Sequence, residues 1–118
     1  MAVARVKDVS RLAAIYLDVM GLSPMVARGV SSNDPDEGRA ARAAMERAEK
    51  AARLVEMQFQ AMKARGELRS FHREFSAARE AAIAAGRPEP SFSAYLRQRK
   101  AQAMRELVRE MVRRRGGF

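Results

Sequence analysis

The side chains best suited to chemistry form a row near the C-terminal end of the sequence. Three arginines recur every four residues, and at helical spacing they share one face with two glutamines. Guanidinium groups bind phosphate oxygens, and the amides add hydrogen-bond donors beside them. Two more arginines follow directly, so the sequence predicts an anion-binding ridge. Its contact residues are Gln98, Gln102, Arg105, Arg109, Arg113, Arg114 and Arg115.

Two other interpretations of this row stay open. Glu106 and Glu110 precede Arg109 and Arg113 by three residues, a spacing that forms ion pairs on a helix, so the row is also consistent with an ordinary solvated face. A helix lying on a membrane surface is a third interpretation. It is disfavoured because the opposite, apolar face carries no Trp or Phe anchor. That face contains Ala101, Met104, Leu107, Val108 and Met111.

Residues able to support catalysis are sparse. The chain has no Cys and one His, His72, so thiolate nucleophiles, thiolate metal sites and a catalytic triad lack their components. Neighbouring carboxylates occur at Asp34, Asp36 and Glu37, where the positive end of a helix dipole explains them. No Gly-rich phosphate loop is present. We therefore expect a protein that is not an enzyme and that uses neither a metal nor a cofactor.

The charge balance points to an anionic partner. The chain carries 23 basic and 14 acidic residues, a net charge of +9, and six of these nine charges belong to residues 97–118. Such a surplus is typical of proteins that bind nucleic acid or an acidic protein surface. No apolar run approaches the length of a membrane span, so we expect a cytoplasmic protein without a membrane partner.

Hydrophobic periodicity and stop signals predict an all-α chain with four main helices. They cover residues 7–20, 34–65, 70–86 and about 91–113, with Gly21, Gly66 and Gly86 as stops. We divide the chain into an N-terminal helical hairpin (1–33), a central hairpin for oligomerisation (34–86) and a basic C-terminal helix with its tail (91–118).

The long central helix carries a heptad seam of mostly small side chains, Ala41, Met45, Ala48, Ala52, Val55, Phe59 and Met62. A second apolar row, Leu54, Met57, Ala61 and Ala64, predicts burial on two sides. We expect this helix to form an antiparallel hairpin with 70–86 through Phe59, Met62, Phe71 and Phe75. Because so small a core cannot bury the seam twice, the hairpin should self-associate.

Residues 12–30 have the order of elements of a helix-turn-helix: a helix, a Gly-containing turn over 21–24 and a second helix. Two features depart from that motif. Leu17 stands where a small residue is usual, and Gly29 is expected to end the second helix after 25–28. The pattern therefore favours a plain helical hairpin, with Arg28 as its one basic candidate for a DNA contact.

The run ARLVEMQFQAMKARGEL, residues 52–68, resembles the central segment of phage small terminase subunits. The resemblance implies an N-terminal helix-turn-helix, a helical hairpin that assembles into rings, and recruitment of a large terminase motor to viral DNA. We therefore expect a non-enzymatic DNA-binding accessory protein that helps DNA packaging and also contacts a larger protein. The alternative is a helical protein-binding module, such as an inhibitor or a small ribonucleoprotein subunit, with its basic helix on an acidic protein surface.

Overall fold

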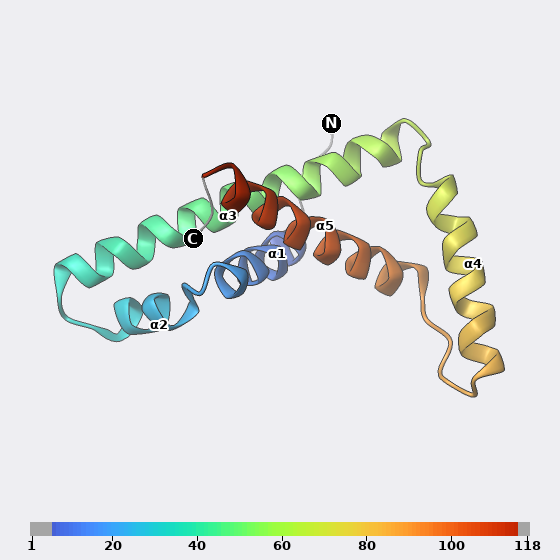
Figure 1. Cartoon of the computed structure of the whole chain (residues 1–118), viewed down its shortest axis with the longest axis horizontal. Helices are drawn as coiled ribbons and strands as arrows, with labels where there is room; N and C mark the ends of the chain where they lie inside the picture. The colour runs from blue at the N-terminus through green and yellow to red at the C-terminus, as the bar shows by residue number, and fades with distance from the viewer. Residues whose placement is uncertain (1–5, 116–118) are drawn as a thin grey trace.

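The computed structural model describes residues 6–115 of the chain, with side chains from residue 8 onward, and every regular element in that range is an α-helix. The all-α prediction is confirmed, with five helices in place of four (Figure 1). The ends of the predicted N-terminal and C-terminal units, 1–5 and 116–118, lie outside the described residues. The helices are α1 (Val6–Val19), α2 (Ser23–Ser31), α3 (Pro35–Ala64), α4 (Arg69–Ala84) and α5 (Phe92–Arg114).

Local capping groups set the N-terminal ends of α3 and α5 and the C-terminal end of α3. The Asp34 carboxylate accepts a hydrogen bond from the Asp36 backbone N–H, and Pro35 occupies the first turn of α3. Ser91 Oγ accepts from the Ala94 backbone N–H at 3.1 Å and caps α5. Gly66, at φ 71°, takes the left-handed conformation that ends α3. Asp34 and Ser91 therefore cap the N-terminal ends of α3 and α5.

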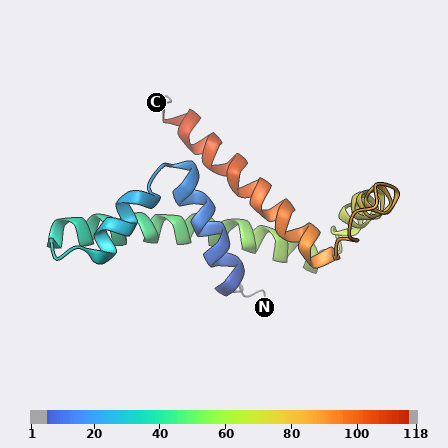
Figure 2. The same ribbon diagram turned by 90° about the horizontal axis from the view of Figure 1, so that it is seen from below.

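The core forms where α1, α3 and α5 cross. α1 packs against both α3 and α5, and α2 lies along the N-terminal half of α3 (Figure 2). The side chains buried at these crossings come from all three helices. α5 crosses α3 near the contact of Lys100 with Glu56, and its C-terminal end lies away from α3 (Figure 2). The largest fully buried side chains are Tyr16, Val55, Glu56, Met104 and Val108.

The predicted antiparallel hairpin of α3 and α4 is not formed. The two helices make no backbone contact, and α4 projects away from the end of α3 (Figure 1). The physical reason is that α1 and α5 already cover the α3 face around Val55 and Phe59. Phe71, in the first turn of α4, stacks its ring on Phe59 at 5.9 Å between centroids. Phe75 instead meets Phe92 of α5, at 5.4 Å.

Gly29 does not end α2, which continues to Ser31. The residue is buried, and a Cβ atom built on it would collide with the Ala41 side chain and the Glu37 carbonyl of α3. The missing side chain thus allows α2 to lie close against α3. The prediction that Gly29 stops the helix was wrong because a glycine serves close helix contact as well as helix termination.

The buried face of α3 differs in part from the predicted seam. Met45 is 38% exposed, and Leu54 and Met57 of the second row are 55% and 46% exposed. The second row is therefore a surface feature, because α4 does not fold back to cover it. Apart from Met45, the seam is covered within the chain by α1, α2 and α5. The buried residues of α3 are Ala41, Ala44, Ala48, Ala51, Ala52, Val55, Glu56 and Phe59.

No single helix within residues 6–115 has the length and apolar character needed to cross a membrane. The segments Asp8–Val19 and Ser23–Ser31 reach that length and composition only when taken together, and they meet at 110°.

Candidate nucleic-acid interface

The predicted row lies on the solvent face of α5. On the opposite face Lys100, Met104 and Val108 are buried in the core, and the remaining apolar side chains of that face are partly buried. All seven predicted contact residues of this helix and its end are exposed, which agrees with the predicted division of its two faces. They are Gln98, Gln102, Arg105, Arg109, Arg113, Arg114 and Arg115.

The arginines of the row differ in how far their charge is balanced. Glu110 carboxylate oxygens lie 2.6 Å from Arg113 and 3.4 Å from Arg114. Arg105 and Arg109 make no ion pair with any side chain in residues 8–115. Arg115 likewise makes no ion pair in this range, so these three guanidinium groups are the cations of the row most available to an external anion.

The predicted partners of the row are used unevenly. Glu106 accepts a hydrogen bond from the Gln102 amide at 3.4 Å and makes no ion pair with Arg109 within the described range. Gln102 also accepts from Arg99 at 3.5 Å. The predicted ion pair of Glu106 with Arg109 is therefore not formed, whereas that of Glu110 with Arg113 is. Gln98 keeps its amide available to solvent.

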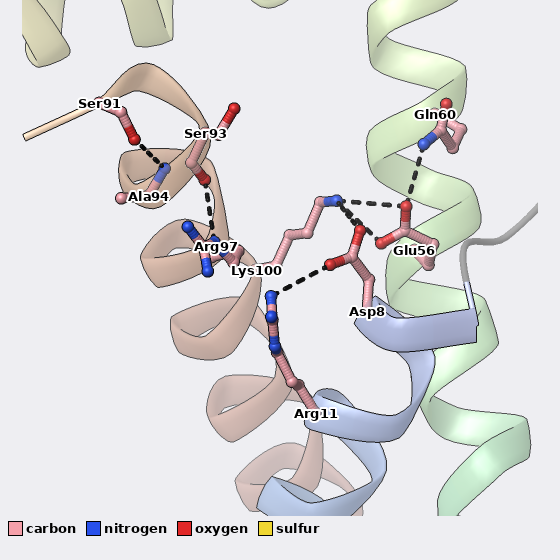
Figure 3. A network of polar contacts seen from close by, with 9 residues as sticks. All are labelled: Asp8, Arg11, Glu56, Gln60, Ser91, Ser93, Ala94, Arg97 and Lys100. Carbon is pink, nitrogen blue, oxygen red and sulfur yellow. Dashed lines mark hydrogen bonds and ion pairs between the residues drawn. The ribbon is translucent and has the colours of Figure 1, made fainter.

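Lys100 is directed into the core and does not contribute to the basic surface. Its ammonium lies 2.9 Å from Glu56 Oε2 and donates hydrogen bonds to Glu56 Oε1 at 3.2 Å and Asp8 Oδ2 at 3.4 Å (Figure 3). The ion cluster joins α5 to α3 and α1. Part of the positive charge counted in the C-terminal segment is therefore balanced inside the protein.

Glu56 is the residue that sequence reasoning missed. It has no exposed surface, and its Oε1 also accepts a hydrogen bond from the Gln60 amide at 3.0 Å. Burial of a carboxylate is costly unless cations and donors compensate it, and Lys100 provides most of that compensation here. The sequence signal for its burial is its position between Ala52 and Phe59, on the apolar face of the helix.

The angle between α1 and α2 is that of a helix-turn-helix, but α2 carries a single basic residue, Arg28. α1 and α2 cross at 110°, within the usual range of that motif. Arg28 is exposed on α2, beside Pro24, Ala27 and Ser31 on the outward face. α2 and α5 make no contact, so the structure does not join Arg28 to the arginine row.

Candidate catalytic and metal groups are few in the part of the chain that the structure describes. The His72 ring stacks on Phe92 with centroids 4.0 Å apart, and the residue is exposed. Within residues 8–115 no three His, Asp or Glu side chains converge in a metal-binding arrangement. No protein-family model, curated protein or solved structure matches this chain.

Proposed function

We propose that this protein is a non-enzymatic accessory protein that binds nucleic acid, DNA above all, through the exposed arginine row of α5. The observation that carries the proposal is the state of Arg105 and Arg109. Both guanidinium groups face solvent without an ion pair among the described residues, while the other side of the same helix is anchored in the core by Lys100, Met104 and Val108.

The length of the row suits a phosphate backbone. Eight residues separate Arg105 from Arg113, which corresponds to about 12 Å along a helix axis. Each DNA strand carries one charge per about 3.4 Å of its axis, so the row spans about three to four phosphates. Gln98 adds a donor at the N-terminal end of the row. Phosphate contacts of this kind fix position without reading sequence, so we expect binding to DNA of any sequence.

The resemblance of residues 52–68 to phage small terminase subunits supports a role in DNA packaging, in which the protein binds DNA and recruits a larger partner. The 110° crossing of α1 and α2 is compatible with a helix-turn-helix, and Arg28 is the residue through which α2 would contribute. Self-association would use the exposed Leu54 and Met57 on α3. The projecting α4 departs from the folded-back hairpin expected of that family, so the ring-forming part of the analogy depends on rearrangement of this helix.

A protein-binding module is the second candidate, and the exposed apolar side chains Leu54, Met57 and Ile83 favour it. In that case the arginine row would meet an acidic protein surface. The two functions differ in the salt dependence of the binding affinity and in which polyanion is bound, nucleic acid or an acidic protein.

Fluorescence anisotropy with labelled duplexes of unrelated sequence tests the proposal. For three phosphate contacts, log affinity should fall against log salt concentration with a slope of about 2.7, equally for every sequence. Absence of binding to DNA or RNA at low salt would contradict the proposal. The arginine row would then be explained as the contact surface of a protein-binding module.

A further inference from the structure

A cavity of about 460 Å³ lies where the C-terminal end of α3, the turn into α4 and the first turns of α5 meet. This size falls within the range of small-ligand sites. Its apolar lining comes from all three segments, through Phe59, Leu68, Phe92 and Leu96. None of the described residues that line it is an Asp or Glu. The cavity thus combines an apolar wall with the absence of negative charge at its surface.

Cationic side chains from two elements converge on this cavity. Lys63 near the end of α3 and Arg69 at the start of α4 line it, and both are exposed and without an ion pair among the described side chains. Arg65, between them in sequence, is instead held by two hydrogen bonds to Glu67, at 2.8 and 3.0 Å. Lys100 also lines the cavity, but carboxylates already balance its charge. The positive charge offered to a ligand therefore comes from Lys63 and Arg69.

The rings of Phe59, His72 and Phe92 line the cavity. His72 and Phe92 both line it and stack with ring planes 10° apart and centroids 4.0 Å apart. Phe59, from α3, is held by its own stack on Phe71. Rings fixed in this way present apolar surface suited to a planar ligand, and stacking of nucleobases on aromatic side chains is a common mode of binding.

We propose that this cavity binds a nucleotide, with its phosphate at Lys63 and Arg69 and its base against the rings of Phe92 and Phe59. Lysine and arginine are the usual cationic partners of phosphate, and the apolar wall removes the base from water. The nucleotide is either free or one unit of a single strand. The inference goes beyond the arginine row and does not depend on it, because none of the row's residues lines the cavity.

Isothermal titration calorimetry with dAMP, inorganic phosphate and a short single-stranded deoxyadenosine oligonucleotide tests this site. We expect dAMP to bind more tightly than inorganic phosphate, because phosphate has no base. The K63Q/R69Q variant should bind dAMP about tenfold more weakly, the effect of losing a charge-assisted hydrogen bond. The control variant R42Q/R47Q loses the same charge from exposed positions on α3 that do not line the cavity, and it should retain the wild-type affinity for dAMP. Far-UV circular dichroism checks that each variant is folded.

The Phe92→Leu variant distinguishes the contribution of the base from that of the phosphate. It should bind dAMP more weakly and bind inorganic phosphate as wild type does. The oligonucleotide is compared with dAMP in the R105Q/R109Q variant, which lacks the α5 contacts. Binding more than about tenfold tighter than dAMP then identifies a strand as the natural ligand, and equal affinities identify the free nucleotide. Both results support a nucleotide site. The proposal is overturned if neither dAMP nor, in the R105Q/R109Q variant, the oligonucleotide binds at about 1 mM. It is also overturned if phosphate binds as tightly as dAMP, or if K63Q/R69Q and R42Q/R47Q lose dAMP affinity equally.

Discussion

Lys100 and Glu56 form a buried ion pair across 44 residues of sequence, with Lys100 Nζ 2.9 Å from Glu56 Oε2. Asp8 of α1 completes the cluster and is itself 3.6 Å from Arg11 at the surface. The pair holds α5 against α3, and so sets which face of α5 is turned outward. The arginine row depends on this orientation, because the row lies on the side of the helix away from Lys100.

Breaking this pair should cost more than removing it entirely. Lys100→Met leaves Glu56 buried without its cation, and we expect the free energy of unfolding to fall by about 3–5 kcal/mol. The double variant E56M/K100M removes both charges and should lie within about 1 kcal/mol of wild type. Urea unfolding followed by circular dichroism measures both. Equal losses in the single and double variants would show that the charges are not coupled.

Gly29 and Gly38 offer a matched pair for the contact of α2 with α3. Gly29→Ala should lower the free energy of unfolding by about 1–3 kcal/mol, because the new methyl group overlaps Ala41 and the Glu37 carbonyl. Gly38→Ala meets Arg42 only at 3.7 Å, and higher helix propensity should stabilise that variant by about 0.5–1 kcal/mol. Urea unfolding distinguishes them. A stabilised Gly29→Ala variant would mean that α2 does not pack closely on α3.

Tyr95 gives the fold a dependence on alkaline pH. Partial burial of the phenol first, and then its 2.6 Å hydrogen bond to Glu74, raise the pKa of Tyr95. A pKa raised by folding contributes stability below the unfolded value, near pH 10, and this stability is lost as the pH rises through the folded value. Ultraviolet titration should show that Glu74→Gln shifts this phenolate transition to lower pH, with Tyr95→Phe used to assign it. An unchanged transition would exclude the Glu74 contribution.

Self-association should depend on the exposed apolar side chains of α3. Leu54 and Met57 lie three residues apart on the same side of the helix, and we expect them to be covered in a dimer or larger assembly at micromolar concentration. Light scattering should give a mass above 13.2 kDa for wild type and 13.2 kDa for the L54E/M57E variant. Wild-type protein that remains at 13.2 kDa at high concentration would contradict the predicted oligomer.

The boundaries of α3 and the start of α5 could be predicted because the groups that set them are local, whereas the end of α2 could not. Asp34, Pro35 and Ser91 cap or open helices through atoms a few residues away, and Gly66 ends α3 through its own backbone. The solvent and core faces of α5 likewise follow from helical periodicity. Helical periodicity therefore predicted correctly that Gln98, Gln102, Arg105, Arg109 and Arg113 share an exposed face of α5.

The direction of α4 and the role of Glu56 depend on tertiary contacts that no local pattern encodes. The Phe59 face of α3 could pack against α4 or against α1 and α5 with the same periodicity, and the second alternative is the one that forms. Glu56 is stable in the core only because Lys100, far along the chain, reaches it. From sequence alone, an acidic residue such as Glu56 on an apolar helix face is interpreted as exposed.

The central claim, that α5 binds nucleic acid through its arginines, is tested most directly by the salt dependence of DNA binding in a matched pair of triple variants. R105Q/R109Q/R113Q removes three charges from the row, and R42Q/R47Q/R53Q removes three exposed charges from α3. We predict that the slope of log affinity against log salt falls by up to about 2.7 in the α5 variant and stays at the wild-type value in the α3 variant. Equal slopes in the two variants, or wild-type protein that binds no DNA at low salt, would contradict the claim.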